Sequence, residues 1–562
     1  MELLEQHFDA AFAAPDGIKK LRELILTLAM HGKLVPQDPD DPPASQLLQE
    51  IDVEKKRLVK EGKIKAPKPL PEITTEEIPY ELREGWQWVR LNEVLDVRDG
   101  THDTPKYVDI GYPLITSKNL YTGKLSFEDV KFISEADHKK INERSAVNVG
   151  DILFAMIGSI GNPVIVNCDD VFSIKNVALF KFYISGRPDN QYVHYFLSFS
   201  QKNMKAASSG AVQSFMSLGF LRSYLFPLPP LPEQRRIVAK IDQLMARCDE
   251  LETLRAEREQ KRRSVHTAAL KQLLDAQTSE SFTDAWQFVN QNFGELYAVK
   301  ENVAELRKTI LQLAVMGKLV SQNPNDPPAS QLLKEIEAEK KRLVREGKIK
   351  ALKSLPEIEQ EEVPYSLPLG WEWVRLGNSM LKITDGTHFS PLNTDTGDFL
   401  YISARNIKDE GVLLNNATYV TKEIHKEIYS RCDPEFGNIL YIKDGATTGI
   451  VTINNLREQF SMLSSVALLK QPTQISNRFI LFTLRSPFFY QEMRAEMSGV
   501  AITRITLKKL DNALIPLPPA PEQHRIAAKI DRLVALCDAL EQHIDTATGK
   551  QTELLNVMMA TA

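Results

Sequence analysis

Cysteine is scarce in this sequence, and long apolar runs are absent. Four cysteines occur among 562 residues, and no two form a CxxC pair, so we expect neither a disulfide framework nor a zinc site. No run of about 18 apolar residues occurs, so no membrane-spanning helix is expected. The N-terminal residues MELLEQHFDA lack the basic and then apolar order of a signal peptide. The sequence therefore predicts a cytoplasmic protein.

Motifs that carry catalysis are also missing. The sequence contains no P-loop, no HExxH and no GxSxG. Asp-Pro-Pro-Ala at 41–44 and 326–329 is similar to the Asp-Pro-Pro-aromatic box of amino-methyltransferases, but alanine stands where an aromatic ring would stack on a flipped base. His102 and His388 have no Cys or His partner at ligand spacing. We expect a non-catalytic chain without a metal.

Length and charge set two further limits. A chain of 562 residues is too long for one hydrophobic core, so we expect two or more domains. Its net charge of -5 disfavours a freestanding nucleic-acid binder, because such proteins are usually basic. Local basic faces, or a complex whose partners share the contact with DNA, are compatible with this charge.

A long internal repeat is the main feature that is present. The shared strip, PPASQLLQEIDVEKKRLVKEGKIKA at 42–66, returns at 327–351 as PPASQLLKEIEAEKKRLVREGKIKA. Of the 24 positions from Pro43 to Ala66, 20 are identical. Because a repeated fold needs only a repeated apolar pattern, this near identity indicates a surface that is used twice. Trp86 and Trp371 keep the same offset, so the chain is a tandem duplication.

Similarity between the two halves is uneven. A closing block, LPPLPEQRRIVAKID at 228–242, returns as LPPAPEQHRIAAKID at 517–531. The middles, 100–225 and 386–514, have diverged, although GDILFAMIGSIGN still matches GNILYIKDGATTG. These patterns predict one repeated scaffold that carries two variable, strand-rich inserts of the same fold.

Helical patterns surround the inserts. Ile18, Leu21, Ile25 and Leu28 have helical spacing before Gly32, which predicts a helix and its end. Each closing block continues into a heptad seam that predicts a long helix. We expect the two long helices to pack on each other through these seams. The seam residues are Ile237, Ile241, Leu244, Cys248 and Leu251 in the first half, and Ile526, Ile530, Leu533, Cys537 and Leu540 in the second.

Four of the five tryptophans form two matched pairs, Trp86 with Trp88 and Trp371 with Trp373. They could stack on bases, or they could be buried anchors where the scaffold meets each insert. We favour anchors, because both copies keep the pair at that boundary.

Taken together, the tandem halves, the variable inserts and the closing block with its heptad helix resemble the specificity subunit of type I restriction-modification systems. The resemblance covers nearly the whole chain, and the long N-terminal scaffold is similar to the larger subfamily. It implies two target recognition domains that each read one half of an asymmetric, bipartite site in double-stranded DNA. It also implies two methyltransferase subunits that carry S-adenosylmethionine, and restriction or translocase subunits that use ATP and Mg²⁺. This chain would hold no cofactor itself.

The expected fold is α+β, a tandem pseudo-two-fold repeat with two strand-rich recognition domains separated by long antiparallel coiled-coil helices, plus a helical N-terminal scaffold. The expected segments are the first scaffold 1–85, the first recognition domain 86–230, the central helix 231–275, a linker 276–300, the second scaffold 301–369, the second recognition domain 370–518 and the C-terminal helix 519–562.

Base readout requires polar or basic side chains at loop tips. Matched loops of the two inserts supply the candidates for DNA contact, and each of them could instead support a turn. They are Asp99, Thr101, His102, Lys118, Asn119, Ser159 and Gln213 in the first insert, and Asp385, Thr387, His388, Arg405, Asn406, Thr447, Thr448 and Arg504 in the second.

The shared strip is predicted to dock the same partner once per half, with phosphate binding as the other interpretation of its basic face. A different function for the whole chain would be a coiled-coil adaptor without direct DNA readout. The candidate partner-binding residues are Lys55, Lys56, Arg57, Lys340, Lys341 and Arg342.

Overall fold

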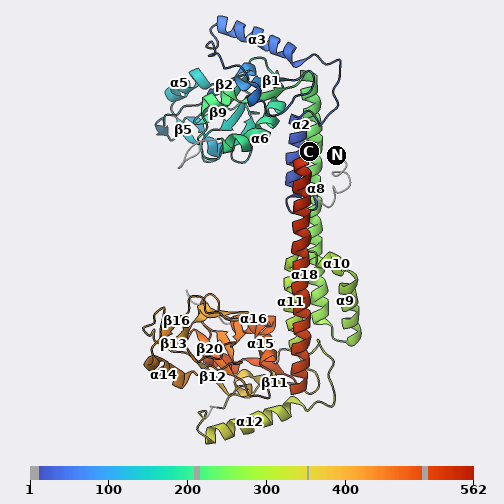
Figure 1. Ribbon diagram of the computed structural model, residues 1–562, viewed down its shortest axis with the longest axis vertical. Helices are drawn as coiled ribbons and strands as arrows, with labels where there is room; N and C mark the ends of the chain where they lie inside the picture. The colour runs from blue at the N-terminus through green and yellow to red at the C-terminus, as the bar shows by residue number, and fades with distance from the viewer. Residues whose placement is uncertain (1–11, 208–214, 351–353, 496–503, 562) are drawn as a thin grey trace. The chain divides into compact units, whose positions relative to one another are not determined.

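The protein consists of two compact units that repeat one arrangement. A computed structural model describes residues 12–207, 215–350, 354–495 and 504–561. The first unit contains residues 1–257 and 547–562, and the second contains residues 258–546. Each unit combines scaffold helices with a mixed, strand-rich domain (Figure 1), so the predicted α+β tandem repeat is confirmed.

The first unit contains the helix predicted for its scaffold. Helix α2 (Gly17–Met30) ends before Gly32, whose φ of 66° is left-handed and suits glycine. The shared strip forms α3 (Ala44–Lys60), which follows Pro43 in extended conformation and buries Leu47 and Ile51. The second unit repeats both helices as α11 (Lys300–Val315) and α12 (Ala329–Arg345).

The first insert domain spans 87–228. A two-stranded ladder of β1 and β10 joins its beginning to its end, and its two four-stranded sheets have the orders β2-β9-β6-β7 and β3-β5-β4-β8. Its elements, with the preceding turn η1 (Thr75–Glu77), are β1 (Gln87–Arg90), α4 (Leu91–Val94), β2 (Leu95–Asp99), β3 (Tyr107–Val108), β4 (Tyr112–Ile115), η2 (Ser117–Leu120), β5 (Lys131–Ile133), α5 (Glu135–Ser145), β6 (Ile152–Ala155), β7 (Gly161–Ile165), β8 (Ser173–Ile174), β9 (Val177–Phe182), α6 (Asn190–Ala206), α7 (Leu218–Ser223) and β10 (Leu225–Leu228).

The second insert domain spans 372–517. Its closing ladder joins β11 to β21, and its main sheet has the order β12-β20-β17-β18 beside a three-stranded sheet β16-β13-β19 and the pair β14-β15. Its elements, with the preceding turn η3 (Gln360–Glu362), are β11 (Glu372–Arg375), α13 (Leu376–Ser379), β12 (Lys382–Asp385), β13 (Phe399–Ile402), η4 (Ala404–Asn406), β14 (Ile407–Lys408), β15 (Gly411–Val412), β16 (Thr418–Val420), α14 (Lys422–Arg431), β17 (Ile439–Ile442), β18 (Val451–Ile453), β19 (Phe460–Met462), β20 (Val466–Lys470), α15 (Asn477–Arg485), α16 (Pro487–Ala495), α17 (Leu507–Asn512) and β21 (Leu514–Leu517).

Each insert domain is followed by a long helix. Helix α8 (Leu231–Asp275) and helix α18 (Ala520–Thr561) follow the closing blocks, as the heptad patterns predict. We expected the two seams to pack on each other. The first residues of each seam instead pack against a scaffold helix of the same unit. Ile237, Ile241 and Cys248 share a buried cluster with Ile25 of α2, whereas Leu251 is 46% exposed. In the second unit, residues of α11 cover the corresponding seam residues Ile526, Ile530 and Cys537.

The expected linker 276–300 contains two helices. Helix α9 (Ser279–Gln291) begins after Thr278, whose hydroxyl accepts a hydrogen bond from the N–H of Ser281. Ala285 and Val289 of α9 are buried in the core of the second unit. A short helix α10 (Phe293–Leu296) then precedes α11.

Matched buried contacts fasten each insert domain to its long helix. The indole N–H of Trp86 donates to Glu233 Oε2 at 2.9 Å, and that of Trp371 donates to Glu522 Oε2 at 3.1 Å. Burial raises the pKa of both carboxyl groups. Trp86 and Trp371 are 8% and 6% exposed, which supports the anchor interpretation of the tryptophan pairs.

The glutamine of each closing block makes a second link. The side-chain oxygen of Gln234 accepts the backbone N–H of Asp189 (2.8 Å), and its amide donates to the carbonyl of Pro229 (2.8 Å). Gln523 repeats the pattern with Ser476 (3.0 Å) and Pro518 (3.0 Å). The block therefore holds the N-cap residue of a domain helix, α6 or α15, against the long helix.

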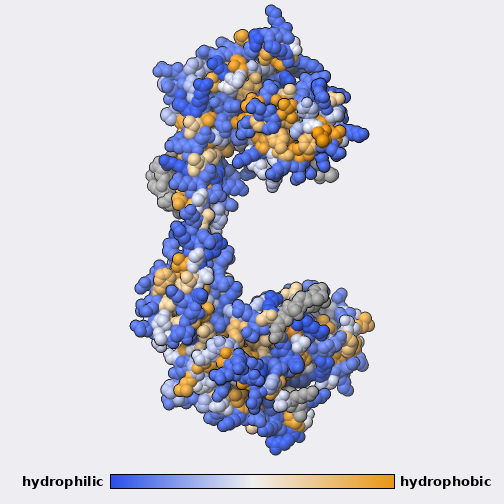
Figure 2. Space-filling view, turned by 180° about the vertical axis from the view of Figure 1, so that it is seen from behind, coloured by the Kyte–Doolittle hydropathy of each residue, from blue (hydrophilic) through white to orange (hydrophobic). Residues whose placement is uncertain are grey.

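Polar residues cover most of the face in Figure 2, and the apolar residues on it gather in small patches. Over the part of the chain that the structure describes, no helix is both long enough and apolar enough to cross a bilayer.

Candidate nucleic-acid interface

Loops from several strands of the first insert domain meet at one place. Thr101 forms a parallel bridge with Lys175, and its N–H donates to the carbonyl of Ile174 (3.0 Å). The N–H of Lys175 donates to the carbonyl of Ile115 (2.9 Å), just before the loop of Lys118. The loops that hold Thr101 and Lys118 are therefore joined through the segment after β8.

Asp99 is the buried centre of this group of loops. Its side chain is 4% exposed, and its Oδ2 lies 2.8 Å from His102 Nε2 while its Oδ1 pairs with Arg144 of α5. The other ring nitrogen of His102 lies 3.1 Å from Asn176 Oδ1. Asp99 thus positions His102, whose ring stays half-exposed.

The second insert domain builds the same group from its own loops. The N–H of Thr387 donates to the carbonyl of Met462 (2.8 Å), and the N–H of Ser464 donates to the carbonyl of Thr387 (2.9 Å). The N–H of Leu463 donates to the carbonyl of Ile402 (3.0 Å), just before the loop of Arg405. The matched candidates are therefore brought together in both domains.

Asp385 has the role of Asp99 and one additional partner. It lies 3.1 Å from His388 Nε2 and 2.6 Å from Arg431 Nη2. Its Oδ2 also lies 3.5 Å from Lys443 Nζ, and that lysine side chain is only 2% exposed. Lys443 is not among the candidates selected from the sequence. The repeat aligns it with the apolar Met156, and a charged residue at a position that is apolar in the other copy could have identified it.

Asn119 and Asn406 are buried and shape the loops rather than projecting from them. Asn119 Oδ1 accepts the N–H of Thr116 (3.0 Å), and its Nδ2 donates to the carbonyl of Ser126 (3.1 Å). Asn406 makes the equivalent bonds. The neighbouring Lys118 and Arg405 are exposed, so the asparagines hold loops that present cations to solvent.

The remaining candidates lie on other loops of the insert domains, between β6 and β7, between β17 and β18 and before α17, and their exposures differ. Thr447 is exposed, Ser159 is half-buried, and Thr448 is buried with its hydroxyl donating to the carbonyl of Gly445 (2.6 Å). Arg504 is exposed beside Asp444. Gln213 lies outside the described residues.

Residues of the shared strip divide into two kinds. Lys55 and Lys340 turn inward, where Lys55 donates to the carbonyl of Asn92 (3.2 Å) and Lys340 donates to the carbonyls of Gly377 and Asn378 (both 2.9 Å). The others stay exposed and form ion pairs along their own helix. These pairs are Lys56–Asp52, Arg57–Glu54, Lys341–Glu337 and Arg342–Glu346.

Lys340 predicts a pH dependence of stability. Burial lowers its pKa to about 8, while Asp511 and Glu337 oppose this shift. Because an unfolded lysine titrates near 10.4, the folded chain binds fewer protons between about pH 8 and 10.4, so stability should rise with pH in this range. We expect the wild type to gain stability relative to Lys340→Met between pH 7 and 9.5 in denaturant titrations. Exposed Lys341→Met is the control, and parallel pH curves for wild type and Lys340→Met would contradict the prediction.

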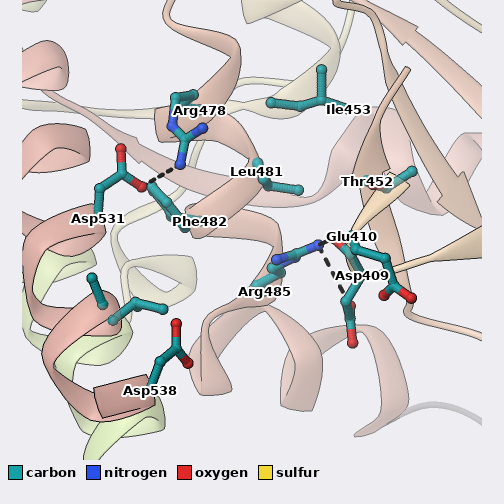
Figure 3. A pocket seen from close by; sticks show the side chains of 12 residues that line it. Asp409, Glu410, Thr452, Ile453, Arg478, Leu481, Phe482, Arg485, Asp531 and Asp538 are labelled. Carbon is teal, nitrogen blue, oxygen red and sulfur yellow. Dashed lines mark hydrogen bonds and ion pairs between the residues drawn. The ribbon is translucent and has the colours of Figure 1, made fainter. Parts of the chain in front are cut away.

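A pocket of about 320 Å³ lies where the second insert domain meets α18 (Figure 3). Arg478 on its rim pairs with Asp531 of α18. Arg485 donates to the carbonyl of Val451 (2.9 Å) and lies 3.5 Å from Asp409. Arg478 therefore links the insert domain to α18, whereas the partners of Arg485 lie within the domain. Over the described ranges no group of three His, Cys, Asp or Glu side chains could hold a metal ion.

Comparison with known proteins identifies the repeated units. The type I restriction modification DNA specificity domain matches residues 83–259 and again 368–547. The chain is 38% identical over 561 residues to the type I restriction enzyme EcoAI specificity subunit of Escherichia coli, covering 96% of this chain and 92% of the relative. It is 33% identical to the EcoEI specificity subunit of the same organism, covering 96% and 93%.

Among solved structures, the HsdS subunit from Thermoanaerobacter tengcongensis aligns with a TM-score of 0.42 at 20% identity, covering 85% of this chain and 97% of that chain. With two matched specificity domains and relatives that align along nearly its full length, this chain belongs to the family of type I restriction enzyme specificity subunits.

Proposed function

We propose that this chain reads an asymmetric, bipartite DNA site, with one half-site for each insert domain, and so directs adenine methylation and restriction by its partners. One observation carries the proposal: equivalent loops, held by equivalent buried contacts, present different side chains in the two domains. His102 with Lys118, and His388 with Arg405, occupy matched places, while the residues around them differ. Different loops on one frame suit two different half-sites.

We infer the partners from the family to which the chain belongs. The repeated scaffold and the exposed part of each shared strip are proposed to dock one methyltransferase subunit per half. These subunits would supply S-adenosylmethionine and the catalytic residues, and restriction or translocase subunits would supply ATP and Mg²⁺ chemistry. This chain contributes recognition without catalytic groups of its own, in the cytoplasm where the DNA is.

Footprinting tests the proposal directly. The chain in complex with its methyltransferase subunits should protect two short half-sites with an unread gap between them. Charge reversal at Lys118 and Arg405 should weaken specific binding by about tenfold or more, since each presents a cation from a recognition loop. Lys140→Glu and Lys426→Glu, on exposed faces of α5 and α14, are the matched controls.

Two results would contradict the proposal. One is protection of a single continuous or palindromic site. The other is intact complex assembly and DNA protection after both charge reversals, which is the behaviour of an adaptor that does not read DNA.

A further inference from the structure

One loop position differs in chemical kind between the insert domains. Ile157 forms an isolated antiparallel bridge with Phe215 in the first domain, and Asp444 forms one with Arg504 in the second. In both domains the residue after the second bridge member donates its N–H to the carbonyl of the residue before the first, at 3.0 Å and 2.8 Å. We call this the bridge position. Its backbone is equivalent in the two domains, whereas its side chains are apolar in one and charged in the other.

In the second domain the bridge position ends a chain of charges. Lys443 Nζ lies 2.8 Å from Asp444 Oδ2 and 3.5 Å from Asp385 Oδ2. Asp385 also binds Arg431 (2.6 Å), and Asp444 pairs with Arg504 (3.3 Å). A buried ammonium group requires such partners, because leaving it unpaired would cost several kcal/mol. This row of side chains alternates three cations with two carboxylates, so it carries one surplus positive charge.

Arg504 stands at the exposed end of that chain. Its side chain is 58% exposed, and the ion pair joins its Nε to Asp444 Oδ1. This oxygen is buried and makes no hydrogen bond within the described part of the chain. The ion pair attracts the Nε side of the guanidinium group, and neither Nη group is bonded to a described residue. Two parallel donors on a held guanidinium match the O6 and N7 acceptors of guanine.

The first domain offers a different surface at the same place. Met156 replaces Lys443 and Ile157 replaces Asp444, so the charged chain is missing at this position. Phe215 replaces Arg504, and it is 41% exposed although it is a large apolar residue. An exposed phenyl ring has no donor for a base edge, but it can pack against the methyl group of thymine.

We propose that the bridge position determines specificity in both halves of the target: Arg504 reads a guanine in one half-site, and Phe215 contacts a thymine methyl in the other. Lys443 and Asp444 are positioning residues for Arg504. This inference rests on the proposed function, and it names one base that is contacted in each half-site.

The guanine contact is tested with base analogues in the complex of this chain with its methyltransferase subunits. Arg504→Ala should weaken binding to the native site by about 5- to 150-fold and remove the preference at one base pair of one half-site. Replacing the contacted guanine by 7-deazaguanine, which lacks the N7 acceptor, should weaken binding by the wild type but not by Arg504→Ala. Asp444→Asn should give a smaller loss at the same base pair.

The thymine contact is tested in the same way. Uracil in place of the contacted thymine removes only the methyl group, and this should weaken wild-type binding about fourfold. The Phe215→Ala variant should not distinguish thymine from uracil. Ile110→Ala, which removes a side chain that is 92% exposed in the same domain, should still distinguish them.

Giving the second domain the bridge residues of the first distinguishes a change of specificity from a general loss of folding. The triple variant Lys443→Met, Asp444→Ile and Arg504→Phe places the apolar bridge in the second domain, and selection from randomised half-sites should then favour thymine where guanine was read. Unchanged protection of the other half-site shows that the protein is folded. An unchanged guanine preference, or an equal loss at every base pair, would overturn the inference. If the wild type protects no bipartite site, the proposed function itself fails.

Discussion

Exchange of residues 95–223 for the corresponding segment of a relative is expected to change one half-site of the DNA target and to leave the other unchanged. The ladder of β1 with β10 and the link from Trp86 to Glu233 stay with the frame. Strand β2 must travel with the insert, because all of its residues pair with β9. Binding to the original site should fall by about 10³-fold or more, the usual gap between specific and non-specific binding. Sequencing of methylated adenines in cells that carry the chimera would give the new site.

The choice of boundaries supplies the control. Exchange from 100 to 225, the limits of divergence in the sequence, would leave β2 of the host against β9 of the donor. It would also separate Asp99 from its partner Arg144. We expect that chimera to fold less well than the 95–223 chimera. If the 95–223 chimera changed both half-sites, the two insert domains would not be independent readers.

Replacement of Arg375 by alanine is expected to destabilise the second unit by about 1–3 kcal/mol. The guanidinium is 6% exposed and donates to the carbonyls of Pro356 (2.8 Å), Glu357 (3.0 Å) and Asn512 (3.0 Å), and it binds Glu362 (2.8 Å). These contacts join the segment after α12 to both ends of the insert domain. Alanine would remove the donor from three partly buried backbone carbonyls, and each acceptor that water cannot reach costs about 1–3 kcal/mol.

Hydrogen exchange measured in β11 and β21 would report this loss locally, which suits a protein with two units. Arg90→Ala should act in the same way on the first unit, because Arg90 makes the equivalent bonds. Arg345→Ala, an exposed arginine at the end of α12, should change stability by less than about 0.5 kcal/mol. A change below about 1 kcal/mol for Arg375→Ala would show that the buried contacts are replaced by water.

Much of the frame could be predicted from the sequence. The apolar spacing and Gly32 define α2, and the heptad seams define α8 and α18, because helix periodicity is a local property of the chain. Helix α9 was missed, although Phe282, Ala285 and Val289 have helical spacing in a segment taken as a linker. Trp286 and Phe288, which are apolar but exposed, interrupt the helical pattern of this buried face.

Tertiary partners of polar residues could not be predicted. The closing block with Glu233 predicts the start of a long helix, but only the fold brings the indole of Trp86 to this glutamate. Lys55 belongs to a charged run in the sequence and yet turns inward to the carbonyl of Asn92. Asp99 is a candidate for DNA contact because it lies in a matched loop. The structure shows that it is buried and positions His102. Whether a polar residue faces solvent depends on neighbours distant in sequence.

The last residues of the chain belong to its first unit. Residues 547–562 group with residues 1–257, and Leu555 and Met558 share a buried cluster with Phe12 and Leu24 of that unit. During synthesis the first insert domain emerges from the ribosome hundreds of residues before these side chains are made. Until residues 547–561 have been made, the apolar surface of α2 that they cover remains open to water. The first unit thus begins folding early and is completed only after the second unit has been synthesised.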